Sequence, residues 1–265
     1  MHLVITGASS GIGEALAREA ARAGHRLTLV ARRRELLERL AGELGATPAA
    51  HVVVKDLSEP AGATEWVAAA EAAHGPIDVL INNAGIENTG PFEESDPAVG
   101  SRLLRTNVET PLLLARHLLP AMVARGSGAI GNVASVAALS PMPLQAWYAA
   151  SKAALATASE TLRRELRATG VHVLTVYPGP VTTAMADAAY ASYGGRKGIV
   201  ALLPEGRADV LARRVLRAIA RRRARVVYPR FYALTRWLAW LPPLLAWLAG
   251  PRLRADAKAR GRREE

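Results

Sequence analysis

Tyr148 and Lys152 stand four residues apart, in the sequence Tyr-Ala-Ala-Ser-Lys, at the start of a long stretch with helical periodicity. This spacing places both side chains on one face of a helix. A free phenol has a pKa of about 10, too high for a base near neutral pH, but a neighbouring cation lowers that pKa. The pair is therefore a candidate general acid and base, although a Tyr and a Lys at this spacing are by themselves usually structural.

A glycine-rich turn is the second motif that could do chemistry. It runs from Thr6 to Gly13 as Thr-Gly-Ala-Ser-Ser-Gly-Ile-Gly, between a short apolar run and a helical stretch. Glycines let the backbone turn tightly against a pyrophosphate, and the N-terminus of the helix offers free N–H groups and the positive end of a dipole. A plain tight turn is the structural alternative. We expect a dinucleotide here, bound by Gly7, Ser9, Ser10, Gly11, Ile12 and Gly13.

The sequence after the second apolar run, Arg32-Arg33-Arg34, bears on the choice of dinucleotide. A site that prefers NAD places Asp or Glu about 20 residues beyond the glycine turn, to bind the ribose 2′-hydroxyl. No acid stands there, and a guanidinium suits a 2′-phosphate. We therefore predict NADP rather than NAD, with Arg32 as first candidate and Arg33 as second. The alternative is that these arginines only begin a solvated helix.

The elements that must position these motifs alternate along the chain. Several of the apolar runs lack polar alternation, as expected for strands buried on both faces. The runs are residues 3–6, 27–30, 51–54, 79–82, 129–133, 171–177 and 225–228. Stretches of helical period lie between them, at 13–24, 34–44, 64–74, 102–125, 148–169 and 207–222. This alternation predicts an α/β fold, a doubly wound Rossmann fold with a seven-stranded parallel sheet, whose ligand crevice lies at the carboxyl ends of the strands.

Further short motifs follow the expected strands in a fixed order. They are Asp56-Leu57, Asn82-Asn83-Ala84-Gly85, Asn107, Ser135, the Tyr148/Lys152 pair and the sequence from Pro178 to Thr183, Pro-Gly-Pro-Val-Thr-Thr. With the glycine turn, this series closely resembles the short-chain dehydrogenase/reductase family over residues 1–229. One position departs from the pattern, because Ala134 precedes Ser135 where the family often has a second serine.

The resemblance implies a role for each of four residues. Tyr148 is expected to be the proton donor and acceptor, and Ser135 to polarise the substrate carbonyl. Lys152 is expected to bind the nicotinamide ribose and to lower the pKa of the tyrosine. Asn107 is expected to hold a water in a proton relay behind Lys152.

The resemblance also implies a path for the cofactor along the crevice. Asp56 and Leu57 match positions that contact the adenine, Asn83, Ala84 and Gly85 line the middle, and Val181 and Thr183, after Pro178 and Gly179, match positions that hold the carboxamide. We therefore expect an oxidoreductase that transfers a hydride between NADP(H) and a hydrophobic ketone, aldehyde or secondary alcohol. The alternative is a non-catalytic NADP-binding regulator or scaffold. We expect no metal, because the six histidines are scattered and are typical of solvated or capping residues.

Two segments are expected to wall the substrate pocket. Residues 184–203 contribute Met185, Tyr190, Tyr193, Ile199 and Leu202, with Gly194, Gly195 and Gly198 as hinges, and residues 139–147 contribute Met142, Leu144, Gln145 and Trp147. Both segments are mainly apolar and show no cluster of charges for a carboxylate or phosphate. This composition favours a hydrophobic substrate, unless the side chains only pack the lid onto the core.

The net charge of +11 lies entirely near the C-terminus. Residues 206–265 hold 16 Lys and Arg against 4 Asp and Glu, whereas residues 1–205 hold 18 against 19. A uniformly basic nucleic-acid binder is therefore disfavoured. The sequence contains no cysteine, which excludes disulfides and thiolate metal sites.

The expected C-terminal helical extension, 230–265, is apolar and aromatic between flanking arginines. Its double proline at 242–243 interrupts the apolar stretch, and no stretch reaches the ~18 apolar residues of a transmembrane helix. Residues 231–263 are expected either to contact a membrane surface or to pack on the lid or another subunit. We expect a cytoplasmic homodimer or homotetramer, in contact with the inner membrane surface if the first alternative holds. No secretory signal is visible.

Overall fold

The structure, a computed structural model, describes residues 1–45, 48–193, 195 and 204–236. Seven parallel strands form one sheet, as the sequence predicted, and their order is β3-β2-β1-β4-β5-β6-β7. The strands are β1 (His2–Thr6), β2 (Arg26–Ala31), β3 (His51–Val54), β4 (Val79–Asn82), β5 (Gly128–Val133), β6 (Val171–Pro178) and β7 (Arg225–Tyr228). Every residue of β1, β4 and β6 is buried, which explains why these runs show no polar alternation.

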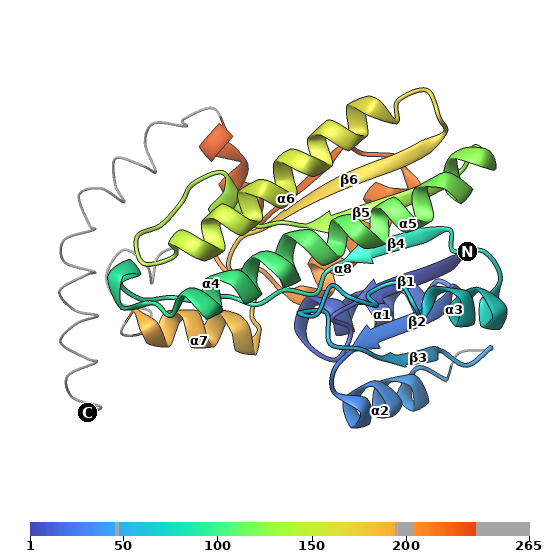
Figure 1. Cartoon of the computed structure of the whole chain (residues 1–265), viewed down its shortest axis with the longest axis horizontal. Coiled ribbons are helices and arrows are strands. Elements are labelled where there is room, and N and C mark those ends of the chain that lie inside the picture. Colours follow the sequence, from blue (N-terminus) through green and yellow to red (C-terminus); the bar gives the residue numbers. More distant parts are fainter. Residues whose placement is uncertain (46–47, 194, 196–203, 237–265) are drawn as a thin grey trace.

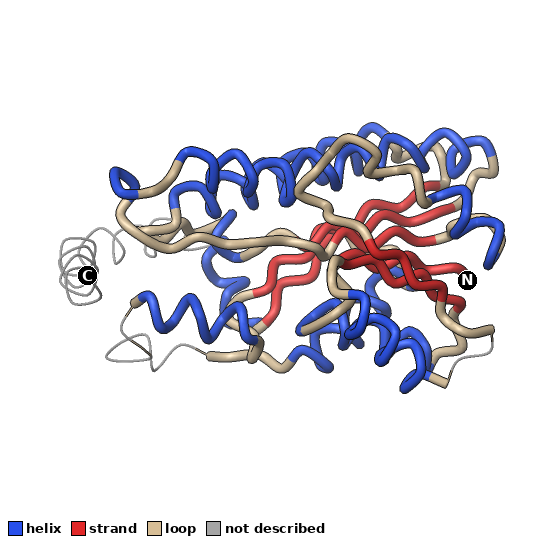
Figure 2. The backbone as a smooth tube through the Cα atoms, turned by 60° about the horizontal axis from the view of Figure 1, so that its bottom comes forward, coloured by secondary structure: helices blue, strands red, loops and turns tan. Residues whose placement is uncertain are grey.

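Helices cover both faces of this sheet and give three layers, seen edge-on in Figure 2. The helices are α1 (Gly11–Arg22), α2 (Arg34–Leu44), α3 (Val67–His74), α4 (Pro97–Leu104), α5 (Thr110–Ala124), α6 (Ala146–Glu165), α7 (Ala184–Ser192) and α8 (Ala208–Ala220). One core lies under α1, α2 and α8, and a second lies under α3, α5 and α6 (Figure 1). The doubly wound fold is thus confirmed as a single domain.

The helix expected over 102–125 is divided by a π-helical turn, η2 (Arg105–Glu109). Helix α4 begins earlier than expected, because the Asp96 carboxylate caps it by accepting the Ala98 N–H. Pro111 has no N–H to donate to the carbonyl four residues back, which belongs to Asn107, and the helix widens at that point. The sequence therefore builds a local irregularity at one of the predicted catalytic positions.

The predicted extension begins directly after β7. A short 3-10 helix, η5 (Arg230–Arg236), lies there, and its Tyr232 donates a hydrogen bond to the Pro204 carbonyl at 3.1 Å. The Tyr232 ring also packs so closely on Gly179 that a Cβ there would lie 2.7 Å from it. The rest of the extension, including its three tryptophans, lies outside the described residues. Among the residues that the structure describes, no helix is long and apolar enough to cross a bilayer.

Candidate active site

The glycine turn between β1 and α1 forms a cradle that side chains would fill. Gly7 has φ of +68°, and a Cβ there would stand 2.8 Å from the Ala84 Cα. A Cβ on Gly13 would stand 2.2 Å from the Gly7 carbonyl oxygen. Glycine is therefore required at both positions, which brings the backbone of the turn against the loop after β4.

Hydrogen bonds lock this turn to the loop after β4. The Thr6 hydroxyl accepts the N–H groups of Asn83 and Ala84, both at 3.0 Å. The Asn83 side-chain amide donates to the carbonyls of Thr6 at 2.9 Å and Gly7 at 3.3 Å. Asn83 and Ala84 thus lie beside the glycine turn, where the sequence placed the middle of the cofactor. Thr6, which begins the glycine-turn motif but was not among the residues expected to bind the cofactor, is the hydroxyl that joins the two loops.

Arg33 lies over the glycine turn. Its guanidinium donates to the hydroxyls of Ser9 at 2.9 Å and Ser10 at 2.7 Å. Ser10 is the N-cap of α1, yet its side chain caps no backbone N–H of the helix. The N-terminus of α1 therefore has no side-chain cap, with a guanidinium close by. Both features suit a phosphate-bearing ligand.

Asp56 and Leu57 follow β3 beside the glycine turn. The Asp56 carboxylate accepts the Ser58 N–H at 2.9 Å and lies 3.9 Å from a guanidinium nitrogen of Arg32. Burial raises the pKa of Asp56, but the Ser58 hydrogen bonds and the Arg32 charge outweigh it, so the pKa is lowered. Leu57 is buried, and its carbonyl accepts the Thr110 hydroxyl at 2.9 Å. Arg32 thus pairs with a carboxylate, whereas Arg33 contacts the glycine turn.

Ser135, Tyr148 and Lys152 meet at the carboxyl end of β5. Ser135 follows this strand, and its hydroxyl accepts the Ala137 N–H at 3.1 Å and hydrogen-bonds the Tyr148 phenol. The Lys152 Nζ donates to the Val133 carbonyl at 2.9 Å and lies 5.9 Å from the centroid of the Tyr148 ring. The fold therefore brings together three residues that the sequence separates by up to 17 positions.

Burial controls the titration of this group. It raises the pKa of Tyr148 to about 12, although the Ser135 hydroxyl acts to lower it. It lowers the pKa of Lys152 to about 8. Removing water disfavours the charged form of both groups. The lowered phenol pKa expected from the sequence is not found in the structure, because desolvation of the phenol outweighs the Ser135 hydrogen bond.

Asn107 is fully buried in the π-helical turn, and its side chain is fully engaged. Its amide donates to the Ile86 carbonyl and to the Ser151 hydroxyl, and its oxygen accepts the Ile86 N–H, all at 2.9 Å. Ser151 in turn donates to the Tyr148 carbonyl at 2.8 Å. Asn107 thereby ties the loop after β4 to the helix of Tyr148. Ser151, between Tyr148 and Lys152, is a link that the spacing did not reveal.

Gly85 lies next to Lys152 and Asn107. A Cβ at this position would stand 3.2 Å from both the Lys152 Nζ and the Asn107 Oδ1. The absence of a side chain therefore leaves room above the lysine, at the point where the sequence expected the cofactor.

The segment after β6 returns to the glycine turn. Pro178 ends β6, and the Gly179 N–H donates to the Tyr228 carbonyl at 2.7 Å. Val181 is buried, and the Thr183 hydroxyl caps α7 by accepting the Ala186 N–H. The methyl group of Thr183 would lie 3.2 Å from a Cβ on Gly11. Thr183, one of the predicted carboxamide positions, thus lies beside the glycine turn predicted to bind phosphate. Ile12 lies in the first turn of α1, between Gly11 and Gly13.

The two expected pocket walls meet at Tyr193, whose hydroxyl donates to the Pro143 carbonyl at 2.8 Å. Leu144 also pairs with the loop after β4, since its carbonyl accepts the Gly90 N–H at 2.8 Å. Trp147 instead packs on α4: a Cβ on Gly100 would lie 2.4 Å from its ring, and its indole donates to Ser95. Trp147 therefore packs against a neighbouring helix, as in the alternative that these side chains serve packing. Gly194, Gly198, Ile199 and Leu202 lie outside the described residues.

Glu87 is a charged residue beside this pocket that the sequence reading missed. It lies in the loop after β4, two positions beyond Gly85, and it is half-buried. Desolvation raises its pKa to about 7, and its charge raises the pKa values of both Tyr148 and Tyr193. A carboxylate with a pKa of about 7 thus lies close enough to both tyrosines to act on them. Pocket walls without a cluster of charged groups were expected from the sequence, and Glu87 was not considered. The loop that carries Glu87 is far from the two tyrosines in the sequence and approaches them only in the folded protein.

No group of three or more His, Asp or Glu side chains within the described ranges could hold a metal ion. Three of the histidines are nevertheless buried rather than solvated: His2, His74 and His172. The ring of His2 pairs with the Gly75 carbonyl at 2.8 Å and the Thr28 hydroxyl at 2.9 Å. It lies near the amino ends of the strands, the edge opposite the catalytic group, and serves packing.

Comparisons with known proteins agree with this geometry. The family profile described as short chain dehydrogenase matches residues 1–194. The chain is 33% identical to dehydrogenase/reductase SDR family member 7B of Bos taurus, over 97% of this chain and 83% of the relative. It is 40% identical to a short chain dehydrogenase of Pseudocercospora fijiensis, over 67% of this chain but only 59% of that relative's length.

A similar solved structure is that of a short-chain dehydrogenase from Sphingobium yanoikuyae in complex with NADPH. The TM-score is 0.77 and the sequences are 32% identical, over 94% of this chain and 95% of that one. The likeness therefore extends over nearly the whole of both chains.

Proposed function

The chain belongs to the short-chain dehydrogenase family, and we propose that it transfers a hydride between NADP(H) and a hydrophobic ketone, aldehyde or secondary alcohol. The observation that carries the proposal is the meeting of Ser135, Tyr148 and Lys152 beside the glycine cradle. The alternative of a non-catalytic regulator or scaffold is less well supported, since none of these three side chains has been lost.

The nicotinamide supplies or accepts the hydride when the cofactor is bound. In the direction of reduction, Tyr148 gives its phenolic proton to the forming alkoxide, and the Ser135 hydroxyl donates a hydrogen bond to the same oxygen. In the direction of oxidation, Tyr148 takes the proton from the alcohol. Lys152 is held beside the ring by the Val133 carbonyl, where its ammonium favours the phenolate.

Asn107 acts in this proposal as a positioning residue. Its side chain fixes Ile86 on one side and, through Ser151, the first turn of the Tyr148 helix on the other. The main-chain carbonyl of Asn107 cannot accept a hydrogen bond from Pro111, because proline has no N–H. This carbonyl is therefore able to hold the expected relay water behind Lys152. The proton that leaves Tyr148 would then be replaced from solvent through the lysine.

NADP is proposed over NAD on the contacts of Arg33. Its guanidinium is fixed by Ser9 and Ser10 at the glycine turn, where a 2′-phosphate on the neighbouring ribose would receive two N–H donors. Arg32 was the first candidate from the sequence, and its pairing with Asp56 makes it the weaker one here. The solved relative that holds NADPH supports the same preference.

The proposed substrate is hydrophobic, because the described pocket walls are mainly apolar, with Met142 and Met185 both exposed. Glu87 adds one carboxylate, which is about half protonated near pH 7. A substrate that carries its own carboxylate would meet repulsion above that pH. Small charged keto acids should therefore be poor substrates, and a preference for them would refute this part of the proposal.

Assembly and location are proposed from the family and the sequence. Members of the family typically form oligomers, and we propose a homodimer or homotetramer through α5 and α6, which light scattering would test. We place the protein in the cytoplasm. Residues 231–263 are proposed to contact the inner membrane surface, or else to pack on the lid or another subunit. Liposome flotation with and without residues 231–265 separates these, since equal flotation of both forms contradicts the membrane contact.

The direct test of the proposed activity is NADPH oxidation across a panel of alkyl and aryl ketones and aldehydes. Tyr148→Phe removes only the phenolic oxygen and should lower kcat by about 10²–10⁴-fold. Tyr193→Phe is the matched control. It also removes one phenolic oxygen beside the expected pocket, but that hydroxyl donates its hydrogen bond to the Pro143 carbonyl. Unchanged turnover in Tyr148→Phe would refute the mechanism.

A further inference from the structure

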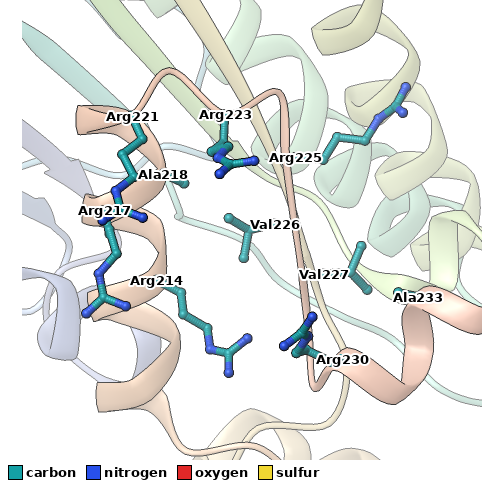
Figure 3. A pocket seen from close by; sticks show the side chains of 10 residues that line it. All are labelled: Arg214, Arg217, Ala218, Arg221, Arg223, Arg225, Val226, Val227, Arg230 and Ala233. Atoms are coloured by element: carbon teal, nitrogen blue, oxygen red, sulfur yellow. The ribbon is translucent and has the colours of Figure 1, made fainter.

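A cavity of about 420 Å³ lies at the β7 edge of the sheet, between α8, β7 and the start of η5. Alanine and valine side chains form part of its lining, from Ala218, Val226, Val227 and Ala233. The remaining six lining residues are all arginines: Arg214, Arg217, Arg221, Arg223, Arg225 and Arg230. They come from three elements and one connecting loop, as Figure 3 shows.

The arginines of this cavity are largely without acidic partners. Arg225 pairs with Glu160 of α6 at 2.5 and 2.6 Å, and the Arg214 guanidinium lies 4.8 Å over the Tyr228 ring. The other four are exposed, and their side chains form no ion pair or hydrogen bond within the described part of the chain. In Figure 3, Arg214, Arg223 and Arg230 reach toward the space between helix and strand, while Arg225 points away.

The helix dipole explains only part of this arrangement. Arg217 and Arg221 lie at the C-terminal end of α8, where cations are favoured. Arg223 in the following loop and Arg230 after β7 gain nothing from that dipole. Several like charges around one cavity repel each other unless anions gather there. A guanidinium offers paired N–H donors that match the oxygens of a phosphate.

The cavity is separate from the cofactor site. Arg33 follows β2, near one edge of the sheet, and the cavity lies at the opposite edge, on β7. Five strand spacings of about 4.8 Å separate β2 from β7, roughly 24 Å in all. No residue of the predicted cofactor site, from the glycine turn to Thr183, lines the cavity.

We propose that the arginine cavity is a second, non-catalytic binding site for a group bearing several phosphate charges. The guanidinium groups bind the phosphate oxygens, and the apolar floor accepts the uncharged part of the ligand. The ligand is either a free polyphosphate compound or the neighbouring headgroups of an anionic phospholipid surface, and both present several phosphate groups to the cavity.

The test uses the full chain saturated with NADPH, so that the Arg33 site is occupied. Arg217→Gln/Arg221→Gln removes two exposed arginines that have no partner among the described residues, and it should leave folding and kcat unchanged. Arg26→Gln/Arg167→Gln is the control, with the same loss of charge at two exposed arginines that do not line the cavity. Calorimetry with inorganic tripolyphosphate should give binding that weakens about tenfold or more in the first variant and less than twofold in the control.

A second arm identifies the source of the phosphate. It measures flotation with vesicles of phosphatidylcholine alone and of phosphatidylcholine with phosphatidylglycerol. Flotation that needs phosphatidylglycerol and is lost only in Arg217→Gln/Arg221→Gln identifies a lipid headgroup. Weaker tripolyphosphate binding in that variant, without any change in flotation, identifies a free ligand. The proposal is overturned if both double variants bind tripolyphosphate and vesicles equally, or if wild type binds neither.

Discussion

The carboxyl end of β5 and the β7 edge both carry cationic side chains, but the protein holds them in opposite ways. At β5 a single lysine is only 4% exposed, and its ammonium is fixed by the Val133 carbonyl. At the β7 edge six arginines line one cavity, and four of them are exposed without partners among the described residues.

This difference separates two uses of positive charge. Burial lowers the pKa of Lys152 to about 8, so its charge can change during a proton transfer near neutral pH. The exposed arginines keep their charge at any physiological pH, and they can attract anions but cannot exchange protons. The first arrangement suits catalysis and the second suits binding.

The largest effect is expected at the glycine cradle, on which cofactor binding depends. A Cβ in Gly13→Ala would lie 2.2 Å from the Gly7 carbonyl oxygen. We expect at least a hundredfold weaker NADPH binding and a free energy of unfolding lower by about 1–3 kcal/mol, measured by fluorescence titration and thermal unfolding. Gly42→Ala in α2 meets nothing within 4 Å and should instead stabilise by about 0.5–1 kcal/mol. Full NADPH affinity in Gly13→Ala would contradict the cradle.

Arg33 tests whether an exposed arginine at the catalytic end also serves as an anion site. Arg33→Ala should raise the Kd for NADPH by about 10–100-fold, since it loses charged hydrogen bonds to the 2′-phosphate, and should leave the Kd for NADH unchanged. Arg34→Ala is the control, because Arg34 faces Glu38 on α2. Equal losses for both nucleotides would mean that Arg33 only supports the fold of the turn.

Glu87 tests the effect of burial on pH dependence. Its folded pKa of about 7 lies above the ordinary value of 4.5, so its ionisation destabilises the folded state increasingly as the pH rises from 4.5 through 7. Glu87→Gln should therefore stabilise the protein at pH 8, by about 1 kcal/mol given partial screening by water, and have no effect at pH 4. The variant should also lower the Tyr148 pKa and speed alcohol oxidation above pH 7. Equal unfolding curves at pH 8 would contradict this account.

Glu160, which lies between Arg225 of the cavity and Arg163 of α6, gives an effect on stability of similar size but opposite sign. Burial raises the Glu160 pKa, but the two guanidiniums lower it by a larger amount, so the folded pKa is below 4.5. The stabilisation is thus complete above pH 4.5 and is lost as the pH falls through the folded value. Glu160→Gln should cost about 1–2 kcal/mol at pH 7 and much less near pH 3. Glu165→Gln, an exposed carboxylate on the same helix, should cost little at either pH.

The strands were predictable because buried parallel strands appear as unbroken apolar runs, such as 3–6 and 79–82. The meeting of the candidate residues could be expected, because Ser135 follows an apolar run and Tyr148 and Lys152 stand four residues apart on one helix. The division of the helix at Asn107 was missed, although Pro111 gave the signal for it. The sequence left open whether Trp147 lines the pocket or packs, because an indole in an apolar segment suits a pocket wall as well as it suits packing on Gly100.

Other features depend on contacts that no local pattern encodes. Glu87 matters because the loop after β4 comes close to Tyr148 and to Tyr193, 61 and 106 positions away in the chain. The basic excess near the C-terminus was visible as a sum of charges. The cavity that these arginines line could not be predicted. It forms only because β7 lies beside α8 and Arg230 turns back toward the helix.

The central claim is that Tyr148 and a bound nicotinamide reduce a carbonyl at the carboxyl end of β5. The direct measurement uses NADPH deuterated at both C4 positions, with mass spectrometry of the alcohol formed from the best ketone of the panel. We predict one deuterium on the carbinol carbon, with a yield at least about a hundredfold lower in Tyr148→Phe. An alcohol without deuterium, or equal yields from the two proteins, would contradict the account.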